Sequence, residues 1–198
     1  MVWLRPDDQD VPVTSTPIDL GRPIAGDVVE LILDDHRRFE TLLRQLRDSS
    51  SDRDAVRRAF AALHVAHAEA EEKHVYPVLR KKRAIDEHER EHGEEEHAEG
   101  HQALLAVLEL KGTDTQAFDD AVEELAKRVN HHLTEEELTI LNPARDEVSE
   151  RVRAELGAAF AVERTTQLDA DCGRVEHVRA IVAAAEREGV LPADNEEG

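Results

Sequence analysis

The chain has 198 residues and a formal net charge of −20, from 45 acidic and 25 basic residues, so it would repel the phosphate backbone of a nucleic acid and an anionic membrane surface. Aromatic residues make up only 3% of a chain that is 40% hydrophobic, so the core must consist mainly of Leu, Val, Ile and Ala, which favours helices over sheets. The single cysteine, Cys172, excludes an intramolecular disulfide and a thiolate-rich metal cage.

The first 23 residues contain four of the seven prolines and show no helical period. We therefore expect residues 1–23 to form an extended arm. The start of the chain lacks the basic and apolar regions of a signal peptide, and no segment reaches the roughly 18 consecutive apolar residues of a membrane-spanning helix. These features predict a cytoplasmic protein that does not enter membranes.

Apolar residues at three- and four-residue steps predict a first helix over about 24–48. A second helix should begin just after it, because Ser51 and Asp54 have the spacing of a capping box. Pro77 is expected to kink or end this helix, since proline removes a backbone hydrogen bond.

A third helix is predicted over about 84–110, and a fourth from near Thr115 to Asn142 and Pro143. Four helices with short connections imply an all-α fold, an up-down-up-down four-helix bundle over residues 24–143.

Two further helices are predicted in the segment 144–190, over about 145–167 and 174–188. They would either pack against the bundle or form a contact in a homodimer. The acidic tail, 191–198, is expected to be disordered.

Histidines and glutamates interrupt the inner apolar stripes of the four bundle helices. Within three of the helices they form pairs four residues apart, which places both side chains on one face, one turn apart. The first helix adds a single histidine. The candidate metal ligands are His36, His67, Glu71, His97, His101, His132 and Glu136.

Seven donors exceed the needs of one octahedral ion and suit two ions close together, with the carboxylates bridging and one position open. Nitrogen-rich, thiolate-free ligation favours iron, with zinc, manganese or cobalt as alternatives, and argues against calcium and magnesium. Two divalent ions and two carboxylates would leave a cationic centre that attracts an anion or an oxygen-derived ligand.

The pattern resembles the hemerythrin family, specifically the bacterial HHE-type cation-binding domains. Four segments in order, DDHRRFETLL, HAEAEEKHVYP, HAEGHQALL and HHLTEEELTILNP, are similar to the four ligand-bearing segments of that family. The resemblance implies that the seven candidates hold an oxo- or hydroxo-bridged di-iron pair. It also implies that one iron binds dioxygen, nitric oxide or peroxide.

The chain departs from the family pattern in three respects. His131 lies five residues before Glu136 and His132 four before it, and both spacings occur in relatives; the apolar register favours His132. Several relatives have Asp where this chain has Glu136. The two C-terminal helices are not part of the minimal family domain, which argues against a simple oxygen carrier.

The other polar residues of these helices have simpler interpretations. Five further histidines are expected to be solvated or to hydrogen-bond to ligands, namely His64, His74, His88, His92 and His177. Glu40 and Glu72 are expected to accept hydrogen bonds from ligands or to be surface charges. Cys172 is expected to be an ordinary thiol in a turn.

Three classes of function are compatible with the sequence. The first is a di-iron protein that binds dioxygen, nitric oxide or peroxide for sensing, storage or stress response. The second is a di-iron enzyme that decomposes peroxide like a catalase or oxidises ferrous iron. The third is a metal-free helical adaptor.

Overall fold

The computed structural model describes residues 18–192, and every regular element among them is helical. Two short π-helices, η1 and η2, interrupt the α-helices. In chain order the elements are α1 (Val28–Arg47), α2 (Arg53–Ala70), η1 (Glu71–Val75), α3 (Tyr76–Lys82), α4 (Glu87–Glu109), α5 (Gln116–Glu136), η2 (Glu137–Leu141), α6 (Asn142–Glu147), α7 (Glu150–Asp169) and α8 (Val175–Glu188).

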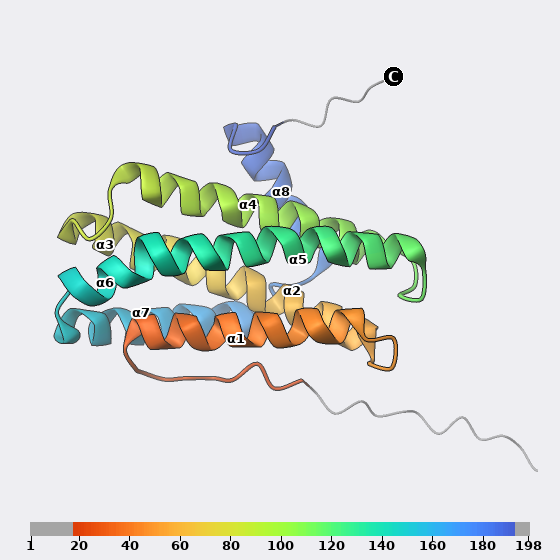
Figure 1. Cartoon of the computed structure of the whole chain (residues 1–198), viewed down its shortest axis with the longest axis horizontal. Coiled ribbons are helices and arrows are strands. Elements are labelled where there is room, and N and C mark those ends of the chain that lie inside the picture. The colour runs from red at the N-terminus through yellow and green to blue at the C-terminus, as the bar shows by residue number, and fades with distance from the viewer. Residues whose placement is uncertain (1–17, 193–198) are drawn as a thin grey trace, which may run out of the picture.

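The helices α1, α2, α4 and α5 form an antiparallel bundle (Figure 1). The loops from α1 to α2 and from α4 to α5 lie at one end of it, and the turns from α3 to α4 and from α6 to α7 lie at the other. This arrangement confirms the predicted all-α fold. Among the described residues, no helix has the length and apolar character needed to cross a membrane.

Side-chain caps set where the helices begin. The Asp86 side chain accepts a hydrogen bond from the Glu89 backbone, and the Glu89 side chain accepts one from the Asp86 backbone, so α4 begins at Glu87. The prediction that Ser51 opens α2 was wrong by one residue. Asp52 is the cap, because its carboxylate accepts a hydrogen bond from the Ala55 backbone.

Neither proline ends its helix, although Pro77 was predicted to kink or end the second helix and the fourth was predicted to end near Pro143. The chain passes through η1 before Pro77 and through η2 before Pro143, and helix continues to Lys82 and to Glu147. A proline ring clashes with the carbonyl four residues earlier in a regular α-helix. A wider π turn just before each proline relieves this clash, which explains why both helices continue.

The C-terminal helices pack against the bundle, which is one of the two roles predicted for them. α7 lies along α1 and α2, and α8 crosses α4 (Figure 1). Phe160 of α7 lies in the same hydrophobic cluster as Ile32 of α1 and Tyr76 of α3. The segment 144–190 therefore shares a core with the bundle.

Two hydrophobic clusters make up most of the core. One contains Phe39, Phe60 and Leu104, and the other contains Ile32, Leu79 and Ile140. Along α1, His36 falls between Ile32 of the second cluster and Phe39 of the first, and along α2, His67 falls between Ala66 of the first cluster and Ala70 of the second. A polar layer therefore lies between two apolar halves of the bundle.

The predicted arm and tail lie partly outside the described residues. Residues 18–27 are non-helical, and 1–17 are not described. The predicted disorder of the tail falls mainly on 193–198, which are also not described.

Candidate metal centre

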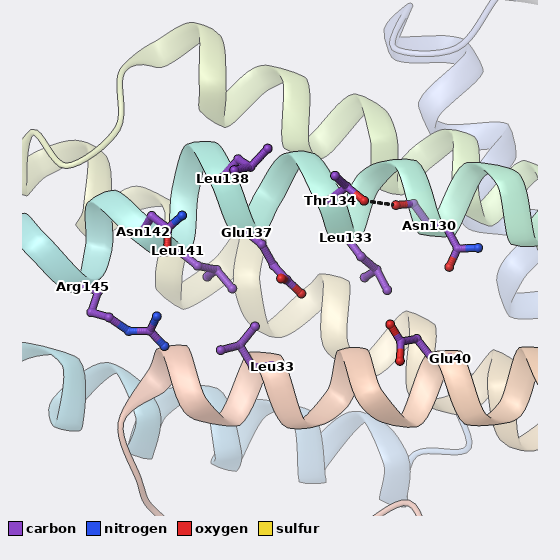
Figure 2. Close-up of a pocket in the computed structure, with 10 residues that line it drawn as sticks. All are labelled: Leu33, Glu40, Asn130, Leu133, Thr134, Glu137, Leu138, Leu141, Asn142 and Arg145. Atoms are coloured by element: carbon purple, nitrogen blue, oxygen red, sulfur yellow. Dashed lines mark hydrogen bonds between the residues drawn. The ribbon is translucent and has the colours of Figure 1, made fainter.

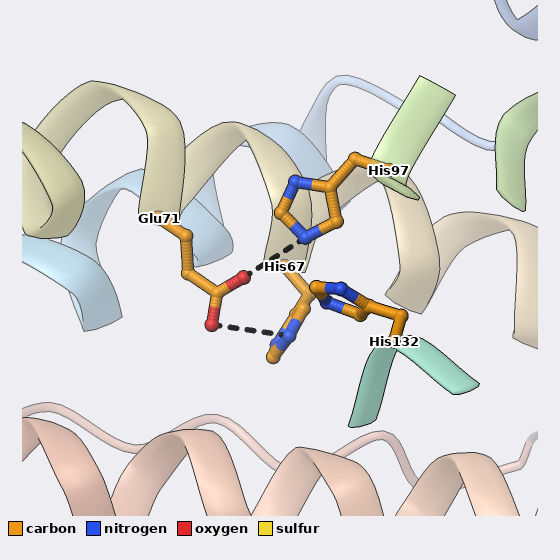
Figure 3. A group of neighbouring side chains, drawn as sticks. All are labelled: His67, Glu71, His97 and His132. Carbon is orange, nitrogen blue, oxygen red and sulfur yellow. Dashed lines mark ion pairs between the residues drawn. The ribbon is translucent and has the colours of Figure 1, made fainter. Parts of the chain in front are cut away.

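The histidines and glutamates of the inner stripes meet in the polar layer. One group has four buried members whose ligand atoms all lie within 4.8 Å of one another, namely His67, Glu71, His97 and His132 (Figure 3). A second group that meets the same criterion consists of His36, His67 and Glu136. Because His67 belongs to both groups, the two groups adjoin and could hold neighbouring ions.

The two carboxylates lie between histidines. Glu71 Oε1 is 3.2 Å from His67 Nε2, while Glu71 Oε2 is 3.2 Å from His97 Nε2. Glu136 Oε2 is 3.1 Å from His36 Nε2. A carboxylate whose two oxygens face two different imidazoles, as in Glu71, is placed as a bridge between two ions would require.

Several ligand-type atoms in this layer are buried without a hydrogen-bond partner. They are the Nε2 atoms of His67, His97, His101 and His132, together with Glu71 Oε1. Each unpaired buried polar atom costs about 1–3 kcal/mol. Bound cations would satisfy this convergent set, so the residues present fit a metal centre.

Four imidazoles of the layer, His36 and three of the histidines just named, have Nδ1 hydrogen-bonded to a carboxylate. The pairs are His36 with Glu137 at 2.9 Å, His67 with Asp35 at 3.4 Å, His97 with Glu72 at 2.8 Å and His132 with Glu96 at 3.1 Å. In the neutral ring, Nδ1–H donates to the carboxylate and Nε2 keeps a free lone pair. Carboxylate partners of this kind orient metal-binding imidazoles and make them better donors.

These four carboxylates form a ring around the polar layer. Asp35, Glu72, Glu96 and Glu137 each directly adjoin a candidate ligand in the sequence. Each nevertheless bonds the histidine of a different helix. The contacts run from α1 to α2, from η1 to α4, from α4 to α5 and from η2 back to α1.

Without a bound metal, the charges around the layer favour protonation of two histidines, His36 and His97, at positions that a cation could take. Burial opposes a charge on His36, but the carboxylates of Glu136 and Glu137 raise its pKa to about 9. Burial likewise opposes a charge on His97, and Glu71 and Glu72 raise its pKa to about 10.

The two candidate bridging carboxyl groups, Glu71 and Glu136, have pKa values shifted in opposite directions. Burial and the nearby charge of Glu136 raise the pKa of Glu71 to about 8. Burial also opposes the charge on Glu136, but hydrogen bonding to His36 and the charge of His132 hold its pKa below the usual range. Two close carboxylates cannot both ionise freely, so one of them retains a proton.

Tyr76 is a site residue that sequence reasoning missed. Its buried hydroxyl donates a hydrogen bond to Glu136 Oε1 at 3.0 Å and lies 3.4 Å from Glu71 Oε2. It therefore contacts both candidate bridging carboxylates. The missed signal is that this residue, the only tyrosine in the chain, follows Glu71 by five residues.

His101 belongs to neither of the two ligand groups. It is buried, and its ring lies edge-on to that of His64, with the centroids 4.8 Å apart. His64 is itself buried between Phe39 and Phe60, and its Nδ1 has no partner. Of the two roles predicted for His64, exposure to solvent was wrong, because Phe39 and Phe60 cover it.

The structure separates the two adjacent histidines of α5. His132 is buried and belongs to the first ligand group. The side chain of His131 is 61% exposed and lies near Glu96 on the outer side of the layer. The π turn of this helix begins after Glu136, so it does not rotate His131 inward.

The remaining polar candidates lie at the edge of the layer or outside it. Glu72 accepts a hydrogen bond from His97, which is one of the two roles predicted for it. Glu40 is exposed and lines a surface pocket. Cys172 is buried in a turn, where burial raises the pKa of its thiol to about 11.

The surface pocket that Glu40 lines lies between α1 and the helix formed by α5, η2 and α6 (Figure 2). Its volume is about 520 Å³, and its lining includes Leu33, Glu137 and Leu141. Glu137 Oε1 accepts the hydrogen bond from His36 Nδ1. One carboxylate thus separates this pocket from a candidate ligand.

One comparison with known proteins finds a match. Residues 27–143 match the family model described as the hemerythrin HHE cation-binding domain. The match covers more than half of the chain and includes all seven candidate ligands. The chain has no match among curated protein sequences or among solved structures.

Proposed function

Since this chain belongs to the hemerythrin HHE cation-binding domain family, we propose that its buried polar layer holds two iron ions. The proposed ligands are His36, His67, Glu71, His97, His101, His132 and Glu136, with the two glutamates as bridges. His101 enters this set through the family resemblance and its unpaired Nε2, although it lies outside the two compact groups.

The observation that carries the proposal is the orientation of the imidazoles. Nε2 atoms converge on the layer without hydrogen-bond partners, and four Nδ1 atoms are held by carboxylates from neighbouring helices. A merely structural histidine cluster would satisfy its buried nitrogens within the protein. Nitrogen and carboxylate donors without thiolate suit iron.

Iron bound here would supply a redox-active centre with a position for dioxygen, nitric oxide or peroxide. The residues of the chain would orient and shield that centre. The hydroxyl of Tyr76 donates to Glu136 and so restrains a bridging carboxylate. The pocket beside Glu137 offers small molecules an approach to within one side chain of His36.

Anaerobic addition of ferrous iron to protein purified without a histidine tag tests the proposal. We expect saturation near two iron ions per chain, followed by a new absorption band on exposure to dioxygen or nitric oxide. The variant H97A should lose most of the iron, whereas H88A, at an exposed position on the same helix, should retain it.

The outcomes separate the alternatives. Absence of iron binding would contradict the proposal and favour a metal-free adaptor. A reversible oxygen-dependent band without oxygen release from peroxide supports a binding or sensing role. Rapid peroxide consumption that is lost in H97A would instead support the enzymatic alternative.

A further inference from the structure

Arg164 of α7 is a fully buried cation outside the segment that matches the family model. Its side chain is 0% exposed, and the match ends at residue 143. Arg164 Nε donates to Asp35 Oδ2 at 2.6 Å, and its Nη2 donates to Asp35 Oδ1 at 2.9 Å. The same guanidinium also donates to the backbone carbonyls of Leu20 and Gly21.

Asp35 is the member of the carboxylate ring that partners His67. Its Oδ2, which accepts from Arg164, lies 3.4 Å from His67 Nδ1. Asp35 is 1% exposed, and Arg38 lies 3.3 Å from its other oxygen. A continuous buried chain of contacts therefore runs from Arg164 through Asp35 to the one histidine that both ligand groups share.

The other three ring carboxylates lack such a partner within the described residues. Glu72 and Glu137 are partly exposed and pair with His97 and His36 alone. Glu96 lies near histidines only, namely His92, His131 and His132. The ring is thus asymmetric, with arginine neutralising it at one position.

α7 also packs closely on this side of the layer. The ring of Phe160 lies edge-on to the ring of His67, with the centroids 5.9 Å apart. Glu163 accepts a hydrogen bond from Lys73 of η1 at 2.8 Å. Arg164 is therefore held in a packed interface rather than on a mobile surface.

The chemistry of this chain of contacts gives Arg164 a definite effect. A carboxylate that accepts from Nδ1–H increases the electron density at Nε2 and strengthens the metal bond. A bidentate arginine on that carboxylate draws negative charge away from the imidazole. The two residues act in opposite directions on His67.

We propose that Arg164 is a positioning residue which, through Asp35, orients His67 and limits its donor strength, so that the C-terminal extension tunes the metal centre. This inference rests on the proposed iron site. It gives α7 a role toward the metal that is separate from covering the core.

Opposite effects of two variants test the inference. In D35N the neutral amide is a weaker acceptor, so iron affinity should fall by roughly 10–100-fold and the reduction potential of the loaded protein should rise. In R164M the carboxylate of Asp35 keeps only Arg38 as a cationic partner, so it is less neutralised and the reduction potential should fall. Affinity is measured by anaerobic ferrous titration, and potential by spectroelectrochemical titration.

Arg153 provides a matched control. It is a second arginine of α7 that anchors this helix to α1, through Asp27 at 2.7 Å, and it contacts no ring carboxylate. R153M should lower thermal stability without changing the potential. R164K, which keeps the charge, should have a potential nearer to that of the wild type than R164M has.

The possible results are distinguishable. If wild-type protein binds no iron, the proposed function fails. If wild-type protein binds iron but D35N and R164M shift the potential in the same direction or not at all, the inference fails and the proposed function stands. Should R164M not fold, an unchanged potential and affinity in D35N would by themselves overturn the inference.

Discussion

The two nitrogens of each imidazole in the polar layer have different surroundings. In His97, Nδ1 faces the carboxylate of Glu72 at 2.8 Å, whereas Nε2 faces inward without a hydrogen bond. The same division holds for His67 and His132. Because a carboxylate engages Nδ1–H, Nε2 is the nitrogen left for a metal ion, and in His97 it becomes a donor when the ring loses its second proton.

The adjacent histidines of α5 provide a prediction at this scale. H132Q should weaken iron binding by at least about 100-fold. Loss of a residue that only hydrogen-bonds to a ligand lowers metal affinity by about 10–100-fold, and H132Q removes a proposed ligand itself. H131Q should retain iron, since His131 is exposed. Iron analysis of the two purified variants checks this, and equal loss in both would contradict the assignment of His132.

A second prediction concerns pH. Because His36 and His97 have pKa values raised to about 9 and 10 in the metal-free protein, their contribution to stability is complete below the ordinary histidine value and is lost as pH rises through 9 and 10. Glu71, raised to about 8, acts in the same direction. Metal-free protein should therefore unfold at lower temperature at pH 9 than at pH 7.

Iron binding should behave in the opposite way over the same range. The metal must displace the protons on His36 and His97, so apparent affinity should rise from pH 7 to pH 9. Calorimetric titrations in buffers of different ionisation enthalpy would measure the protons released. Binding without proton release would contradict the protonated state assigned to these two histidines.

Six of the seven candidate ligands meet in the two ligand groups, which the sequence indicated because helical spacing places such residues on the inner faces. His101 lies in neither group. The carboxylate ring could not be predicted in the same way, since Asp35 contacts a histidine 32 residues away and Glu137 one that lies 101 residues away. Only packing reveals those contacts. A usable signal was present, however, because every ring carboxylate directly adjoins a candidate ligand in the sequence.

At the scale of elements, the helices and their order followed from apolar periodicity, but their interruptions did not. Pro77 was expected to mark a kink or an end, and Pro143 an end. Instead, η1 begins at Glu71 and η2 begins directly after Glu136, and each π turn ends shortly before the proline. Single-sequence periodicity assumes a constant helical repeat, so it cannot detect a local π turn.

The docking of α7 depends on Gly157. A Cβ atom at this position would lie 2.0 Å from the backbone oxygen of Gly26 and 3.1 Å from the backbone nitrogen of Val28. The backbone of α7 therefore lies directly against the backbone at the start of α1, and only glycine at position 157 permits this close approach.

G157A should accordingly destabilise the protein by about 1–3 kcal/mol, the usual cost of overpacking. A154S, an exposed change on the same helix, should have an effect within about 0.5 kcal/mol. Urea unfolding followed by circular dichroism compares the two. Equal stability of G157A and the wild type would show that α7 does not pack on α1 as described.

A polar layer divides the core into two apolar clusters. Without metal, this layer lowers the stability of the protein, because buried nitrogens lack hydrogen-bond partners and carboxylates lie close together. Bound iron would satisfy these groups and join all four bundle helices. A homodimer through the C-terminal helices stays a prediction, since the described contacts of α7 and α8 are with the bundle of the same chain.

Iron should therefore stabilise the molecule as a whole. At a free iron concentration 1,000 times the dissociation constant, linkage gives about 4 kcal/mol, which corresponds to a rise in melting temperature of roughly 8–16 °C for a chain of this size. Differential scanning calorimetry of loaded and metal-free protein measures the rise. The variant H97A should show little of it.

The stoichiometry of anaerobic ferrous binding decides whether the polar layer is the two-ion iron site that we propose. We predict saturation near two iron ions per chain, with binding abolished by the double variant E71Q/E136Q, which removes both proposed bridges. Saturation near one ion would contradict the paired site, and absence of binding would contradict the metal centre altogether.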